Sequence, residues 1–195
     1  MGIKTADGPA GASAAIARAL SNLSSGGPAT FDMERAAPQH LTKPIQVFTV
    51  PVDLTTSLDF LDMATPIGWR YLVVDSIQEP GSLAAVDVKE DEAGSATFQA
   101  LSHGRMPERL AEASQLAANL LGDTPQDFEV RILELPALYL AALWLIGTDR
   151  SNLFIPFLDA TASAPVRVDP EFPARVLARA TAKRQKRTAE PGRSN

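Results

Sequence analysis

Residues 69–101 read WRYLVVDSIQEPGSLAAVDVKEDEAGSATFQAL, and their pattern sets the fold class. Three runs rich in apolar residues are separated by two turns that contain Pro, Gly and acidic residues. Such runs are typical of β-strands, and short turns between them favour antiparallel pairing. We therefore expect a meander of three strands over 69–77, 83–89 and 96–101. The first run is apolar on both faces, which predicts a central strand.

The flanking sequence predicts two helices. Apolar residues recur at helical spacing from 106 to 121, as in an amphipathic helix packed on one face of a sheet. Pro107 suits the first turn of this helix, and Gly122 stands where a left-handed C-cap is expected. A capping-box pattern at Thr56–Asp59 predicts a second, short helix near 57–64.

Four further strands are expected, at 45–52, 128–132, 139–146 and 153–158. The segment 138–146 leaves strand and helix open, because Leu and Ala favour helix. Its nine residues are short for a helix, and a turn-rich loop follows them. We therefore predict a hairpin of the last two strands, with a bulge at Pro136. Pro156 has no amide donor, so the final strand is expected at a sheet edge.

Together these elements predict a single α+β domain with a mainly antiparallel sheet of six or seven strands. The folded part is expected to span 44–158. Residues 1–43 are punctuated by Gly and Pro, which predicts a disordered leader with one possible short helix at 13–23. Residues 159–195 are expected to form a flexible basic arm that is partly helical at 171–187.

Composition excludes several kinds of site. The chain has no Cys and two His, which excludes disulfides, thiolate zinc sites and His-rich metal centres. Walker, dinucleotide-binding and zinc-protease motifs are missing, so we expect no metal and no cofactor, and we lean against an enzyme. No run approaches the ~20 apolar residues that span a bilayer. With no transmembrane segment and no secretory signal expected, the default location is cytoplasmic.

The centre of the chain is acidic, whereas its C-terminal segment is basic. Residues 44–158 carry six basic and sixteen acidic residues, whereas 171–195 carry seven basic and two acidic ones. Three uses of the basic arm stay open: a solvated tail, a contact with an acidic protein partner or with the acidic body itself, and binding to nucleic acid or a membrane surface. Phe172 is the one aromatic residue of the arm, so a stacking platform for nucleic acid is lacking. The basic candidates are Arg175, Arg179, Lys183, Arg184, Lys186 and Arg187.

Large apolar residues form a second candidate surface. Tyr139, Leu143, Trp144 and Phe154 lie in the predicted hairpin and form a ridge richer than a one-faced sheet requires. They belong either to the core or to a subunit interface, because large aromatics concentrate at association surfaces.

Two residues are candidates for catalysis. His103 follows Ser102 in the loop before the long helix, and a Ser–His pair suggests a nucleophile. Glu134 lies between two leucines, where burial would raise the pKa of its carboxyl and suit an acid or base. The competing interpretations are a polar helix-entry loop and a carboxyl at the margin of the core.

The sequence thus favours a non-catalytic protein-interaction or assembly module that self-associates or docks on a protein partner. Two alternatives stay open. One is an enzyme of unrecognised class with a site near His103 and Glu134. The other is a nucleic-acid accessory protein that binds through the C-terminal arm.

Overall fold

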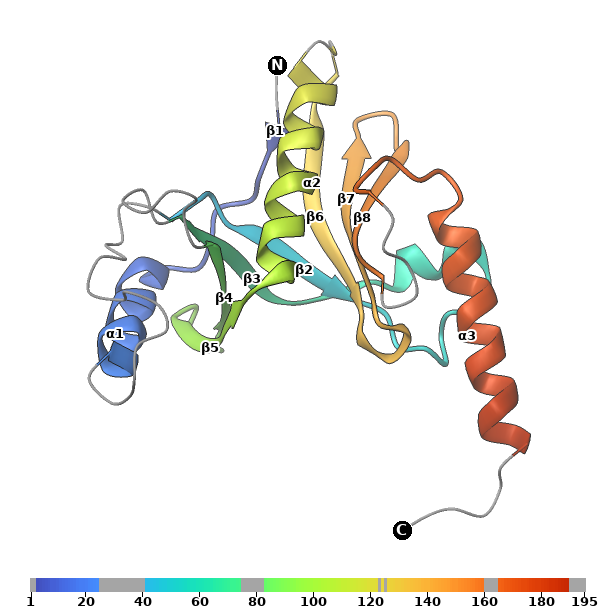
Figure 1. The fold of residues 1–195 in the computed structure, drawn as a ribbon, viewed down its shortest axis with the longest axis horizontal. Coiled ribbons are helices and arrows are strands. Elements are labelled where there is room, and N and C mark those ends of the chain that lie inside the picture. Colours follow the sequence, from blue (N-terminus) through green and yellow to red (C-terminus); the bar gives the residue numbers. More distant parts are fainter. Residues whose placement is uncertain are drawn as a thin grey trace.

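The computed structural model describes residues 3–24, 41–74, 83–122, 124, 126–159 and 165–189. Its strands form one sheet in the order β5-β4-β3-β2-β6-β7-β8, and β1 pairs with β6 outside this path (Figure 1). The strands are β1 (Ile3–Lys4), β2 (Ile45–Thr49), β3 (Thr65–Val74), β4 (Leu83–Glu90), β5 (Ala96–His103), β6 (Phe128–Leu135), β7 (Leu140–Gly147) and β8 (Asn152–Asp159). The helices are α1 (Ala12–Ser24), α2 (Arg105–Gly122) and α3 (Phe172–Ala189), with 3-10 helices η3 (Leu58–Met63) and η4 (Pro136–Leu138).

The predicted fold class is confirmed. All seven expected strands occur, α2 is the long amphipathic helix, and η3 is the short one. The meander β3-β4-β5 and the hairpin β7-β8 pair as expected, and β8 lies at an edge of the sheet. The parallel pair β2–β6 joins the two antiparallel halves. The predicted strand residues 75–77 and turn 79–82 lie outside the described residues.

Two local predictions are wrong. Pro136 begins η4 instead of a bulge, and Tyr139 at φ 54° turns the chain from η4 into β7. The register shift of the β7–β8 hairpin falls between Ala141 and Ala142. Gly122 is the last residue of α2 and lacks the positive φ of a left-handed cap.

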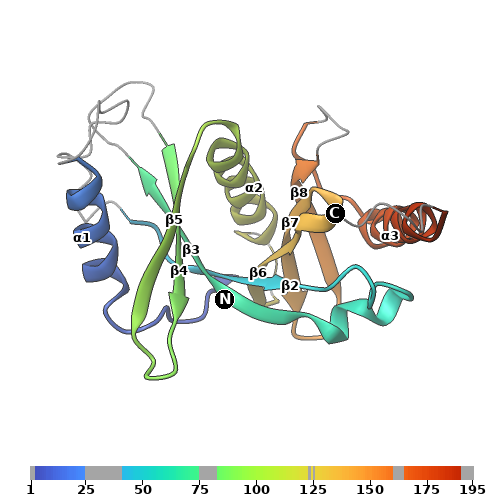
Figure 2. The ribbon, with the colours of Figure 1, turned by 90° about the horizontal axis from the view of Figure 1, so that it is seen from below.

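Helices cover both faces of the curved sheet (Figure 2). Helix α2 lies inside the curve and packs on residues from both halves, including Leu72, Ile132 and Ile155. Helix α1 covers the other face at the β5 end, and α3 covers that face at the β8 end. Each helix therefore closes a separate apolar cluster on the sheet.

Strand β7 shows why a continuous apolar run forms a strand here. Its odd-numbered residues from Ala141 to Leu145 face α2, and its even-numbered residues from Leu140 to Trp144 face the α3 side. A strand that is buried on both faces needs apolar residues at successive positions. The Leu and Ala content of β7 therefore reflects this double burial, which overrides their preference for helix.

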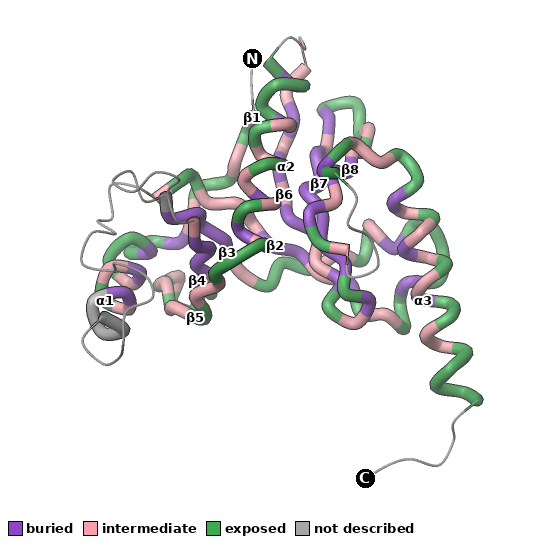
Figure 3. The backbone as a smooth tube through the Cα atoms, in the orientation of Figure 1, coloured by how far each residue is buried: buried purple, intermediate pink, exposed green. Residues whose placement is uncertain are grey.

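The folded body extends beyond the expected boundaries at 43 and 159. Ile16 and Leu20 of α1 are buried against the face that carries Trp69, so the possible helix at 13–23 forms and packs on the sheet. Phe172, Val176 and Ala180 of α3 are fully buried (Figure 3). Residues spaced four apart lie on one side of a helix, so each helix presents an apolar stripe.

Among the described residues, none of the helices combines the length and apolar character that a membrane crossing requires.

Gly68 of β3 lies close to the backbone of β4. A Cβ atom at this position would come within 2.7 Å of the carbonyl oxygen of Val88. Gly122, by contrast, has open space around the equivalent position.

We expect Gly68→Ala to lower the free energy of unfolding by about 1–3 kcal/mol, because the clash is with backbone that cannot rotate away. Gly122→Ala is the matched control and should change stability by less than about 1 kcal/mol. Urea denaturation of both variants measures the difference. Equal stability of the two variants would show that β3 and β4 are not this close.

Candidate functional site

Most of the C-terminal basic residues bind back onto the folded body. Arg179 pairs with Asp159 at 2.9 Å, Arg187 pairs with Asp53 at 3.1 Å, and Arg175 pairs with Asp169 at 2.6 Å. Lys183 donates to the carbonyl of Ala137, whereas Lys186 is exposed. Of the three uses considered for these residues, contact with the chain's own body is the one that the described geometry displays.

Arg184 forms hydrogen bonds with the loop 51–64, which precedes β3. Its guanidinium donates to the carbonyl oxygens of Val52 at 2.9 Å and Thr55 at 2.7 Å. Thr55 is itself buried and donates its hydroxyl proton to the carbonyl of Pro51. Inside the same loop, Phe60 is fully buried in the cluster that α3 closes. The hydrogen bonds of Arg184 and the burial of Phe60 thus both hold the loop 51–64 on the folded body.

This loop nevertheless presents large apolar side chains to solvent. Leu54, Leu58 and Met63 are exposed, and Ile67 follows at the start of β3. We call these four residues the η3 surface. They make up four of the seven exposed large apolar side chains among the described residues, within 14 positions of sequence. Contiguous exposed apolar side chains mark interaction sites more often than scattered ones do, so this concentration within one short segment is a candidate interaction site.

Two carboxylates accompany the η3 surface. Asp59 and Asp62 are both exposed on η3, and neither forms an ion pair within the described chain. Asp53, in the same loop, is neutralised by Arg187. The η3 surface is therefore apolar with an unneutralised negative charge beside it.

The predicted apolar ridge is part of the core. Leu143 is buried under α2, whereas Trp144 and Phe154 are buried under α3. Phe154 stacks between Trp144 and Phe172, with ring centroids 6.3 and 5.3 Å away. Tyr139 is the exception, with 67% of its surface exposed. Of these four candidates, Tyr139 alone remains accessible, because α2 covers Leu143 and α3 covers Trp144 and Phe154.

Glu134 binds a buried arginine. Arg70 of β3 is 6% exposed and donates to Glu134 of β6 at 2.5 Å and to both oxygens of Asp87 of β4. Burial of the guanidinium lowers its pKa, but the hydrogen bonds and charges of the two carboxylates outweigh this effect and raise the pKa above its ordinary value. Arg70 thus ties strands of both halves together, and Glu134 serves as its counter-ion.

His103 and Glu134 lie on opposite faces of the sheet. His103 ends β5 opposite Ala84, whose side chain faces α1. Glu134 shares the face of Val130 and Ile132, which lies under α2. Three strands separate β5 from β6. The structure therefore does not bring these two residues into one site.

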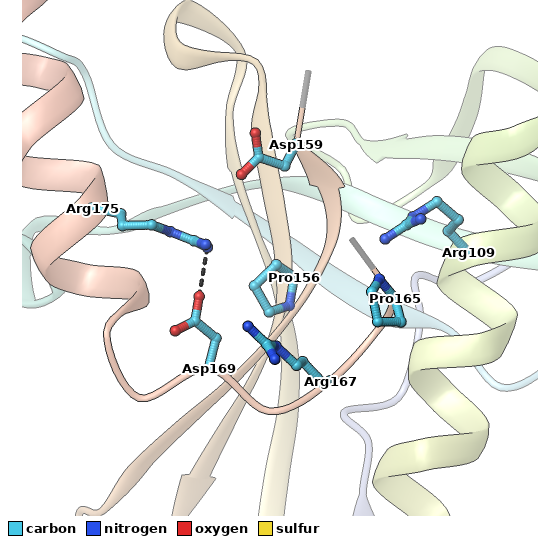
Figure 4. Close-up of a pocket in the computed structure, with 7 residues that line it drawn as sticks. All are labelled: Arg109, Pro156, Asp159, Pro165, Arg167, Asp169 and Arg175. Atoms are coloured by element: carbon cyan, nitrogen blue, oxygen red, sulfur yellow. Dashed lines mark ion pairs between the residues drawn. The ribbon is translucent and has the colours of Figure 1, made fainter. Parts of the chain in front are cut away.

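The edge of β8 is covered by the chain itself. The amide of Asp169 donates to the carbonyl of Phe154, and Arg109 of α2 donates to the carbonyl of Phe157. Figure 4 shows the resulting small pocket, in which Arg109 and Arg175 approach Pro156 from opposite sides. Its volume of about 40 Å³ is small, and its lining carries charges of both signs. We therefore interpret these residues as a structural cover of the β8 edge.

At the opposite edge of the sheet, other features limit the pairing of β5 with a further strand. The amide of Ala96 donates to the carbonyl of Ala10, and the register shift against β4 leaves Gln99 as an extra residue. Bulges and local cover are devices that limit pairing of sheet edges between molecules. Neither edge of the described sheet is therefore a long, flat surface for strand addition.

No protein family, curated protein or solved structure matches this chain. In the part of the chain that the structure describes, no three Asp, Glu or His side chains gather as metal ligands would. The η3 surface was not among the residues singled out from the sequence. In the sequence, its four large apolar residues lie within 53–67, a segment that also contains Asp53, Asp59 and Asp62.

Replacing Arg70 tests its place in the joint between the two halves. We expect Arg70→Met to reduce the free energy of unfolding by about 3 kcal/mol, since two half-buried carboxylates would lose their counter-ion. Arg187→Met removes an exposed ion pair and should cost less than about 1 kcal/mol. Urea denaturation at neutral pH measures both. A small loss for both variants would mean that Arg70 does not hold the sheet together.

Proposed function

We propose that this protein is a non-catalytic docking module that binds a protein partner through the η3 surface. The observation that supports it is an apolar surface displayed by a loop that the rest of the chain holds in place. Apolar side chains on a mobile loop would lose conformational freedom on binding, which costs affinity. The hydrogen bonds of Arg184 and the burial of Phe60 reduce that cost before a partner arrives.

The charge beside the η3 surface indicates the chemistry of the partner. Asp59 and Asp62 would face the rim of any protein that covers Leu58 and Met63. A partner with an apolar groove and basic residues at its rim would complement this surface, and charge complementarity speeds association and excludes wrong partners.

Self-association through the η3 surface is the less favoured form. In a two-fold dimer the same patch meets itself, so Asp59 and Asp62 of both copies would approach each other. Like charges at an interface are repulsive. The covered edge of β8 and the bulge of β5 also work against pairing of sheets between copies.

The two other functions receive less support. An enzyme built on His103 and Glu134 would need residues from opposite faces of the sheet to meet. A nucleic-acid contact would have to draw on basic side chains that are bound to Asp159, Asp169 and Asp53. A heterologous protein contact through the η3 surface is thus the function that the geometry favours.

Site-specific photo-crosslinking in the native host tests this proposal. We expect p-benzoylphenylalanine at position 58 to give a defined adduct with another protein, and the same group at position 120 to give none. Leu120 is the matched control because it is also an exposed leucine, but on α2. With the captured partner purified, Leu58→Asn should raise the Kd about tenfold or more, and Leu120→Asn should leave it unchanged.

Charge reversal provides the second arm of this test. Asp59→Lys combined with Asp62→Lys should weaken binding most at low salt, because screening reduces the effect of surface charges. Adducts of equal yield at positions 58 and 120 would contradict the proposal. So would an adduct at position 58 that contains only a second copy of this chain.

A further inference from the structure

A second feature of the molecule is a cavity between α2 and the inner face of the sheet. Its volume is about 300 Å³, which is at the lower end of the range for small-molecule sites. Its deep wall consists of Leu72, Ala117, Val130 and Leu143, which are all buried. These residues come from β3, α2, β6 and β7, so the walls belong to rigid elements.

The mouth of the cavity is polar and carries donors. Thr42 and Lys43 are exposed there, and Thr5 is half-buried. The Thr42 hydroxyl oxygen accepts the amide proton of Leu72 at 3.0 Å. A hydroxyl group that accepts one hydrogen bond can still donate its own proton to a ligand. Lys43 forms no ion pair with any described residue, and none of the described residues that line the cavity carries a carboxylate.

This distribution defines a ligand by its chemistry. An apolar interior favours a hydrocarbon chain or ring, and an ammonium with two hydroxyl groups at the mouth favours an anion. Because one water-sized group takes about 30 Å³, the cavity accommodates roughly ten non-hydrogen atoms. We propose that this cavity binds a small amphipathic carboxylate, with its apolar part between α2 and the sheet and its carboxylate at Lys43.

The inference is independent of the proposed docking function. The cavity lies on the α2 face, whereas Phe60 anchors the η3 surface on the α3 face. Loss of ligand binding would leave partner binding intact, and the reverse also holds. The two proposals therefore fail separately.

Titration of the full chain with a series of fatty acids tests the cavity, and methyl NMR provides the readout. We expect butanoate, hexanoate and octanoate to shift the methyl signals of Leu72, Val130 and Leu143. Affinity should rise about fourfold for each added methylene. The rise should stop by dodecanoate, because the longer chain no longer fits.

Two comparisons test the role of Lys43. Octan-1-ol should bind about tenfold more weakly than octanoate, and Lys43→Met should weaken octanoate by a similar factor. Lys186→Met is the matched control, because Lys186 is an exposed lysine on α3, away from the cavity. Its affinity for octanoate should equal that of the wild type.

Filling the cavity provides a further check. Ala117→Leu should abolish octanoate binding, and Ser114→Leu, at a half-buried position of the same wall, serves if the first variant does not fold. Absence of saturable shifts in the wild type would overturn the proposal. Equal affinity for octanoate and octan-1-ol would overturn the assignment of a carboxylate.

Discussion

The packing of α3 on the outer face of the sheet is the contact on which the loop 51–64 and the β8 end of the sheet depend. Its stripe of Phe172, Val176 and Ala180 covers Trp144 and Phe154, which would otherwise form a large exposed apolar surface. Burial of such side chains is the main favourable term in folding. Because the stripe fixes the helix, its arginines reach carbonyl and carboxylate groups of the body at defined places.

Among the described residues, this arrangement covers the β8 edge and the aromatic ridge but leaves the η3 surface exposed. The segment before α3 covers the edge of β8, and α3 itself covers the aromatic ridge. Arg184 then holds the loop 51–64, although that loop presents Leu54, Leu58 and Met63 outward. The proposed docking function rests on this contrast between the buried apolar residues and the exposed group that the loop holds in place.

The sequence was sufficient where the deciding forces are local. Alternation and turn residues located the seven strands, and the periodicity of Leu110, Ala113 and Ala117 located α2. Length and turn arguments also settled β7 correctly as a strand. These features depend on neighbours a few residues apart, which any single sequence displays.

Contacts between distant segments could not be predicted in the same way. Arg184 meets Val52 from 132 residues away, and Arg70 meets Glu134 from 64 residues away. Without those partners, the basic C-terminal residues resembled a tail and Glu134 resembled an isolated carboxyl. The η3 surface was missed for the same reason, because exposure of Leu58 depends on what α3 and β3 leave uncovered.

Hydrogen exchange in the loop 51–64 tests the central claim most directly, namely that α3 holds this loop in place for docking. The amides of Phe60 and Ala64 donate to Ser57 and Leu61, so we expect them to be protected in the wild type. Arg184→Met should accelerate their exchange about tenfold or more while leaving β6 and β7 unchanged, and Lys186→Met should have no effect. Exchange of these two amides at the rate of an unstructured peptide in the wild type would contradict the account.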